Sequence, residues 1–121
     1  MEVLRVLVVD DEAELVSAVV ERLEIRGFAA QGALTGAEAL DLVRRQPFDV
    51  VVLDVKMPGL GGLEVIKQLK RDHPGLQVIL LTGHGSAESA QEGMQLGAFD
   101  YLMKPINIES LVKILHQAAG R

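Results

Sequence analysis

Short runs of β-branched and leucine residues alternate along this sequence with longer stretches that have helical periodicity. Three of the runs are strong, at residues 4–9, 50–53 and 78–81, and two are weaker, at residues 28–33 and 99–103. Near-continuous apolar strands are typical of a parallel sheet that is buried on both faces by helices. The alternation therefore predicts an α/β fold, with five strands and five helices in a doubly wound parallel sheet.

The stretches between the runs have the spacing and the end signals of amphipathic helices. Apolar residues recur at i, i+3, i+4 and i+7 in residues 16–23 and 108–115. Capping side chains and glycines mark the expected helix ends, namely Thr35 with Glu38, Asn107, Gly27 and Gly97. The helix expected over residues 86–96 is weakly held, because its apolar stripe is limited to Ala87, Ala90 and Met94, with Gly93 inside it.

Composition narrows the class of protein before any motif is considered. A chain of 121 residues, 49% of them hydrophobic, suffices for one domain, expected over residues 1–121. The net charge of −5 and the dispersed basic residues argue against direct binding of nucleic acid. No apolar run is long enough for a membrane span and residues 1–6 lack a signal-peptide pattern, so the expected location is the cytoplasm.

Polar residues stand at the carboxyl ends of four of the predicted strands. Asp10 and Asp11 follow the first strand, whereas Asp54, Thr82 and Lys104 end the third, fourth and fifth. In open parallel sheets these ends meet at one edge, where ligands bind. Each residue taken alone has a structural explanation, such as a helix cap, a turn or an ordinary loop. Three carboxylates and one ammonium at one edge have no such explanation, and they indicate a functional site.

The chemistry of this set points to phosphoryl transfer assisted by a metal. Neighbouring carboxylates repel one another unless a cation holds them, and Mg²⁺ or Mn²⁺ binds such oxygen ligands together with a phosphate. Lys104 offers a positive charge for phosphoryl oxygens, and Thr82 offers a hydroxyl donor. A carboxylate nucleophile, here Asp54, can take the phosphoryl group covalently.

These residues, in this order, resemble the receiver domains of two-component response regulators over essentially the whole chain. The resemblance rests on the two aspartates at 10–11, Leu-Asp-Val-Lys-Met-Pro-Gly at 53–59, Leu-Thr-Gly-His-Gly at 81–85 and the stretch 97–105 that ends in Lys-Pro. It implies a flavodoxin-like receiver fold with strand order 2-1-3-4-5. It also implies that Asp54 is the phospho-acceptor.

The resemblance further implies how the metal is held. Asp11 would be the direct metal ligand, and Asp10 would act mostly through water. Asp54 and the backbone carbonyl of Lys56 would complete the protein ligands for Mg²⁺ or Mn²⁺. Lys104 would bind phosphoryl oxygens.

The resemblance also implies roles in the switching of the domain and in the lifetime of its phosphoryl group. Thr82 would bind a phosphoryl oxygen and move, and Tyr101 would be the aromatic residue that follows it. The peptide bond between Lys104 and Pro105 would be cis. Lys56 and His84 stand where side chains tune phosphoryl lifetime in the family, and the alternative for each is a solvated loop residue.

A receiver domain is a phosphorelay switch with weak intrinsic autophosphorylation and autodephosphorylation, so this resemblance predicts a signalling protein and not an enzyme in the usual sense. Its partners would be a sensor histidine kinase or a histidine phosphotransfer protein, and a downstream target or an output domain. Residues 86–118 would form the surface that changes on phosphorylation. Dimerisation through the fourth and fifth helices is an open alternative. The loop sequences at residues 57–59 and 82–85 are similar to those of regulators of the nitrogen-regulation type.

Two other classes of protein also place functional groups at this edge of such a sheet. A metal-dependent phosphatase of the haloacid dehalogenase type has a second Asp two residues after its nucleophile, whereas Lys56 occupies that position here. A flavodoxin-like electron carrier would present small hydroxyl residues to a phosphate after the first strand. The negative charges of Asp10 and Asp11 would repel that phosphate.

Overall fold

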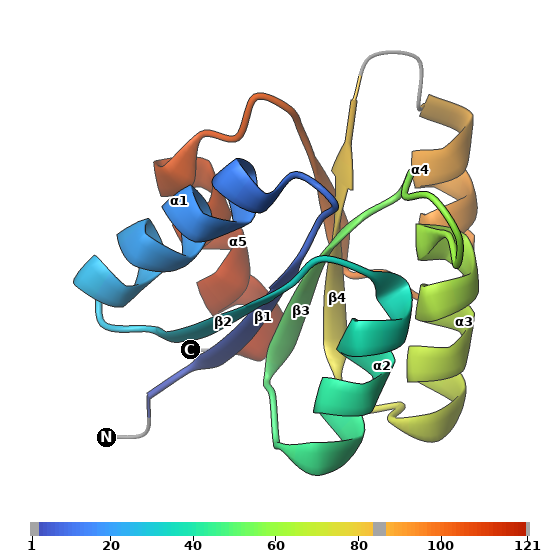
Figure 1. Cartoon of the computed structure of the whole chain (residues 1–121), viewed down its shortest axis with the longest axis horizontal. Helices are drawn as coiled ribbons and strands as arrows, with labels where there is room; N and C mark the ends of the chain where they lie inside the picture. Colours follow the sequence, from blue (N-terminus) through green and yellow to red (C-terminus); the bar gives the residue numbers. More distant parts are fainter. Residues whose placement is uncertain (1–2, 84–86, 121) are drawn as a thin grey trace.

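Five parallel strands form one sheet in the order β2-β1-β3-β4-β5 (Figure 1). The computed structural model describes residues 3–83 and 87–120. Within these residues the strands are β1 (Arg5–Val9), β2 (Ala29–Ala33), β3 (Val50–Asp54), β4 (Gln77–Thr82) and β5 (Asp100–Met103). The predicted strands and their order are confirmed, and each strand boundary lies within one residue of the apolar run that predicted it.

Helices cover both faces of the sheet, as the doubly wound class requires. They are α1 (Ala13–Ile25), α2 (Gly36–Arg45), α3 (Gly62–Asp72), α4 (Ala87–Gln95) and α5 (Ile108–Ala119). Figure 1 shows α1 and α5 on one face and α2, α3 and α4 on the other. Among the helices of the described residues, none combines the length and the apolar composition that a membrane span requires.

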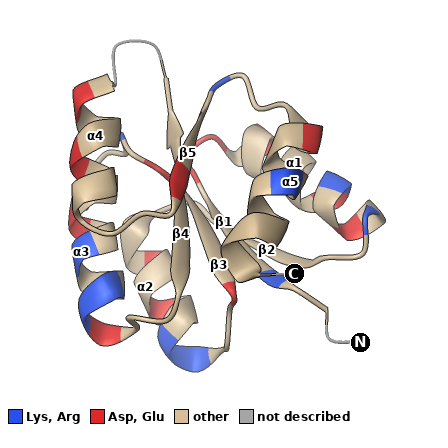
Figure 2. Cartoon of the chain, turned by 180° about the vertical axis from the view of Figure 1, so that it is seen from behind, with Lys and Arg blue, Asp and Glu red and all other residues tan. Residues whose placement is uncertain are grey.

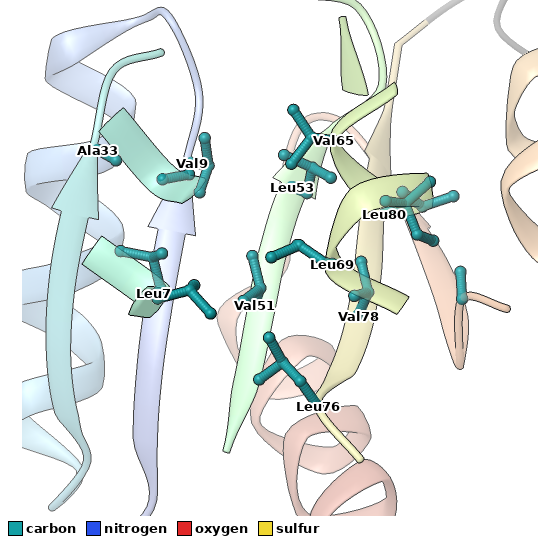
Figure 3. Packing of buried hydrophobic residues seen from close by; sticks show 14 of the residues in the cluster. Leu7, Val9, Ala33, Val51, Leu53, Val65, Leu69, Leu76, Val78 and Leu80 are labelled. Carbon is teal, nitrogen blue, oxygen red and sulfur yellow. The ribbon is translucent and has the colours of Figure 1, made fainter. Parts of the chain in front are cut away.

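The core consists of two apolar clusters, one on each face, because successive strand residues point to opposite sides of a sheet. On β1, Leu7 and Val9 pack toward α2 and α3, whereas Val6 and Val8 pack toward α1 and α5. Figure 3 shows the first of these clusters, in which labelled side chains of β1, β3 and β4 share a cluster with Val65 and Leu69 of α3. Every residue of β3 is buried, which explains why its run is uninterrupted up to Asp54.

The expected helix ends are confirmed. Thr35 Oγ1 accepts a hydrogen bond from the Glu38 backbone N–H at 3.1 Å, and Asn107 Oδ1 caps α5 in the same way at 3.0 Å. The Glu38 carboxylate in turn accepts a hydrogen bond at 2.8 Å from the backbone N–H of the residue before Thr35. Gly27 and Gly97 follow α1 and α4 with φ of +91° and +113°, the left-handed region that ends helices.

The apolar stripe predicted for the fourth helix is wrong in its phase. Ala90 and Gly93 are the buried residues of α4, whereas Ala87 and Met94 are exposed. Gly93 lies so close to the buried side chain of Leu80 on β4 that an added Cβ would overlap it. The helix therefore approaches the sheet through a glycine, which a pattern based on apolar side chains does not detect.

Candidate functional site

The predicted site residues meet at the carboxyl edge of the sheet. Asp10 and Asp11 directly follow β1, Asp54 and Thr82 are the last residues of β3 and β4, and Lys104 directly follows β5. The parallel register of these strands keeps their ends level. Figure 2 shows that the basic residues in the last turns of α2 and α3 lie at the opposite edge of the sheet.

Three carboxylates form a compact acidic cluster at this edge. Each of Asp10, Asp11 and Asp54 offers a carboxylate oxygen, and these oxygens all lie within 4.8 Å of one another. Asp10 is fully buried, Asp54 is buried and Asp11 is exposed to solvent. The cluster is therefore open on the side of Asp11, while its other two members lie against the end of the core.

The environment of Asp10 tests whether this cluster suits a metal ion. Asp10 Oδ2 is buried, and its partner among the described residues is the ammonium of Lys104, whose Nζ lies 2.7 Å away. The three clustered carboxylates carry more negative charge than one ammonium balances, which is costly at a partly buried site unless a further cation is bound. Oxygen ligands from several carboxylates are the donor set that Mg²⁺ and Mn²⁺ prefer, so the residues present fit such an ion.

Lys104 places one ammonium against three carboxylates. Its Nζ lies 2.7 Å from Asp10 Oδ2, 3.1 Å from Glu12 Oε1 and 3.4 Å from Asp54 Oδ2. Its side chain is only 19% exposed. Burial alone lowers the pKa of Lys104, but the hydrogen-bonded and charged contacts with Asp10 and Glu12, and the charge of Asp54, raise the pKa on balance above the usual lysine value. The ammonium therefore stays charged at neutral pH.

The Asp54 carboxylate contacts both the Lys104 ammonium and a backbone N–H group. Burial and the nearby charge of Asp10 raise its pKa above the ordinary aspartate value, against a smaller lowering by the backbone N–H of Lys56 and by Lys104. The Lys56 N–H donates to Asp54 Oδ1 at 3.2 Å, and Lys104 Nζ donates to Oδ2 at 3.4 Å. Both carboxylate oxygens thus face a donor, and the group is held at the end of a fully buried strand.

Thr82 ends the neighbouring strand β4, one residue beyond the register partner of Asp54. It is buried, and its Oγ1 donates a long hydrogen bond of 3.5 Å to the Leu102 carbonyl on β5. Its own carbonyl accepts a bond of 2.8 Å from the Lys104 backbone N–H. Tyr101 lies on β5 and is 46% exposed. The hydroxyl of Thr82 is therefore weakly engaged, and the Tyr101 ring lies at the surface.

The structure describes some of the remaining predicted residues and not others. Lys56 lies two residues beyond Asp54 in an exposed position. The peptide bond between Lys104 and Pro105 is cis, as expected. His84, the other residue expected to tune phosphoryl lifetime, and Ser86, where the fourth helix was expected to begin, lie outside the described residues.

Sequence reasoning missed one residue of the site, Glu12. Taken alone, Asp10 or Asp11 could have been explained as the cap of the helix that follows them. Instead Glu12 is the N-cap of α1, no side chain caps the helix there, and the Glu12 carboxylate contacts Lys104. The sequence contained one signal for another role of Glu12. Glutamate is a poor N-cap compared with Ser, Thr, Asp or Asn.

Comparisons with known proteins agree with this geometry. The family model described as the response regulator receiver domain matches residues 6–116. The chain is 43% identical over 107 residues to the probable transcriptional regulatory protein TcrX of Mycobacterium tuberculosis, covering 88% of this chain and 46% of that protein. It is 37% identical over 113 residues to the DNA-binding transcriptional regulator NtrC of Escherichia coli, covering 93% of this chain and 24% of NtrC.

Solved structures give the same result for the whole length of the chain. A response regulator receiver domain protein from Clostridium thermocellum has a TM-score of 0.94 and 35% identity, with 98% of this chain and 96% of that chain covered. The curated relatives are longer, since this chain spans less than half the length of TcrX and about a quarter of the length of NtrC.

Proposed function

Because this chain belongs to the response regulator receiver domain family, we propose that it accepts a phosphoryl group on Asp54 from a sensor histidine kinase or a histidine phosphotransfer protein. Receiver domains of two-component systems act as signalling switches and not as enzymes in the usual sense. Membership of this family also decides against the haloacid dehalogenase and the electron-carrier alternatives.

The observation that carries the proposal is the position of the Asp54 carboxylate. It stands at the carboxyl end of the central strand β3, beside two other carboxylates and 3.4 Å from the Lys104 ammonium. A nucleophilic carboxylate needs charge neutralisation when an anionic phosphoryl group approaches it. Lys104 supplies one positive charge, and the acidic cluster supplies ligands for another.

Asp10, Asp11, Asp54 and the backbone carbonyl of Lys56 are the groups that would hold Mg²⁺ or Mn²⁺. The ion would neutralise the carboxylates and the incoming phosphoryl oxygens. In this proposal Asp11 is the ligand most open to exchange, because it is the exposed member of the cluster. Asp10 is fully buried and already pairs with Lys104, so it would act on the ion mostly through a bound water.

The reaction that we propose is a displacement at phosphorus. An oxygen of the Asp54 carboxylate attacks, a P–O bond forms, and the P–N bond of the donor phosphohistidine breaks, so that the imidazole leaves with the electron pair of that bond. The Lys104 ammonium neutralises charge on the phosphoryl oxygens. Water later attacks the same phosphorus, which releases inorganic phosphate and restores the carboxylate.

In the switching step that we propose, Thr82 Oγ1 gives up its long bond to the Leu102 carbonyl and donates to a phosphoryl oxygen. Tyr101 then turns from its exposed position into the space that Thr82 leaves. The surface formed by α4, β5 and α5 thereby changes its affinity for a partner protein, for a second copy of the chain or for an output domain. NtrC, of which this chain matches about a quarter, is by name a DNA-binding regulator.

Intact mass spectrometry after incubation with acetyl phosphate and Mg²⁺ tests the acceptor. We expect a single phosphoryl adduct in the wild-type protein, formed as acetate leaves, and its loss on metal chelation. Asp54→Asn should give no adduct. Asp41→Asn is the matched control, because Asp41 is a partly exposed aspartate on α2 that pairs with Arg45, and it should be phosphorylated like the wild type. An equal adduct in Asp54→Asn would contradict the proposal.

A further inference from the structure

Glu12 holds an unusual position for a residue that begins a helix. It is the N-cap of α1, with extended backbone angles, yet no side chain makes a capping hydrogen bond there. The N-caps of α2 and α5, Thr35 and Asn107, both make that bond. The backbone N–H of Glu12 itself donates to Asp10 Oδ1 at 2.9 Å, but the first N–H groups of α1 receive no cap from the Glu12 carboxylate, which contacts Lys104 instead.

The partner of this carboxylate is the site lysine, 92 positions away in the sequence. Lys104 Nζ donates to Glu12 Oε1 at 3.1 Å, a shorter contact than the 3.4 Å to Asp54 Oδ2. A lysine ammonium has three N–H donors. In this structure three carboxylates lie around it, those of Asp10, Glu12 and Asp54.

The three partners of Lys104 differ in how firmly they are held. Asp10 and Asp54 are buried and belong to the acidic cluster that fits a metal ion. The Glu12 side chain is 63% exposed and is not a member of that cluster. Its contact with Lys104 can therefore break and re-form without opening the core, whereas the other two contacts involve groups packed at the ends of β1 and β3.

We propose that Glu12 is a positioning residue that competes with the phosphoryl group for Lys104. In the resting protein its carboxylate occupies one of the ammonium donors. When Asp54 is phosphorylated, a phosphoryl oxygen takes over that donor and Glu12 is released to solvent. The inference rests on the proposed function, because it assigns Glu12 a role in the same reaction. Glu12 thereby sets how strongly the site holds a phosphoryl group, without touching the metal or the acceptor.

Beryllium fluoride, a phosphoryl mimic that bonds to a carboxylate oxygen, tests this role. Its affinity is measured at saturating Mg²⁺, so that a change in metal affinity does not enter the result. Glu12→Gln removes the charge that holds Lys104, and binding should become roughly two- to five-fold tighter, the range of an exposed ion pair. Glu14→Gln removes a charge from the same first turn of α1, where no contact with Lys104 is formed, and should leave the affinity unchanged.

A charge-preserving variant separates the contact from the general field of the carboxylate. Glu12→Asp keeps the negative charge, but its shorter side chain does not reach Lys104 and suits the vacant N-cap of α1. We expect it to bind beryllium fluoride more tightly, as Glu12→Gln does. Wild-type affinity in Glu12→Asp, or equal effects in Glu12→Gln and Glu14→Gln, would overturn the role of Glu12 and leave the proposed function intact. A wild-type protein that does not bind the mimic at all would overturn both.

Discussion

Lys104 Nζ lies 3.4 Å from Asp54 Oδ2, although the two residues are 50 positions apart in the sequence. The contact exists because β3 and β5 end at the same edge of the sheet, with β4 between them. A parallel sheet with crossover helices brings strand ends together in this way regardless of their distance along the chain. The proposed nucleophile and the ammonium are therefore held close together by the fold, and the proposed reaction would need little rearrangement at this point.

Replacing Asp54 should stabilise the metal-free protein at neutral pH. Burial and Asp10 raise the pKa of Asp54 in the folded state, so folding binds a proton and the ionised carboxylate costs stability as pH rises through the unfolded and then the folded pKa. Asp54→Asn removes that cost. We expect a gain on the order of 1 kcal/mol in the free energy of unfolding, measured by urea denaturation at neutral pH without divalent metal.

The wild type and Asp54→Asn should have similar free energies of unfolding at acidic pH. Below the pKa of Asp54 the wild-type carboxyl is neutral, so the difference between wild type and Asp54→Asn should shrink at about pH 4 or lower. A variant that is less stable than the wild type at neutral pH would show that the ionised carboxylate is fully compensated by Lys104.

Mg²⁺ should raise the unfolding temperature of the protein through the acidic cluster. A ligand that binds only the folded state stabilises it in proportion to the logarithm of its concentration over its dissociation constant. Asp11→Asn removes the exposed member of the proposed ligand set and should weaken Mg²⁺ binding about ten-fold or more, which is roughly 1.4 kcal/mol. Glu24→Gln, an exposed carboxylate at the far end of α1, is the control and should respond to Mg²⁺ as the wild type does. Identical responses in all three proteins would exclude this metal site.

Gly93→Ala should destabilise the protein even though alanine favours helices. A Cβ at this position overlaps the side chain of Leu80, which is buried in the sheet, so α4 would have to move away from β4. Overpacking of this kind costs about 1–3 kcal/mol. Gly75→Ala is the control, because its Cβ meets no atom within 4 Å and its φ is not positive. It should change the free energy of unfolding by about 0.5 kcal/mol at most. Equal stabilities of the two variants would contradict the packing described for α4.

Tyr101 should become less accessible when the phosphoryl mimic binds. The chain has one Tyr and no Trp, so intrinsic fluorescence reports this ring alone. We expect weaker quenching by acrylamide with Mg²⁺ and beryllium fluoride than with Mg²⁺ only, because the ring leaves its exposed position. Thr82→Ala should abolish the change and Thr82→Ser should retain it, since serine keeps the hydroxyl. If the change in quenching persists in Thr82→Ala, the movement of Tyr101 does not depend on the Thr82 hydroxyl.

Hydrophobic periodicity was sufficient to predict the strands and the edge at which the site lies. The strands β1, β3 and β4 are buried on both faces, and a strand in that environment has few sequence alternatives to a continuous apolar run. Once such strands are parallel, the polar residue that ends each of them must lie at the common carboxyl edge. The positions of Asp54, Thr82 and Lys104 followed from that rule.

Contacts across the sheet were not predictable by the same reasoning. Asp10 and Asp11 are neighbours of the same type, yet one is fully buried and the other is exposed, because this depends on how the chain turns after β1. The bond between Glu12 and Lys104 joins two loops that no local pattern connects. In α4 the face toward the sheet is set by the place of Leu80, and a helical pattern alone does not contain that information.

Chemical trapping of the acyl phosphate tests the central claim most directly. Borohydride reduces an aspartyl phosphate to homoserine, and peptide mapping by mass spectrometry then identifies the residue that carried the phosphoryl group. After incubation with a phosphodonor and Mg²⁺, we expect homoserine at position 54 and unmodified aspartate at Asp10 and Asp11. Trapping at Asp10 or Asp11, or no homoserine in protein that carries a phosphoryl adduct, would contradict the assignment of Asp54 as the acceptor.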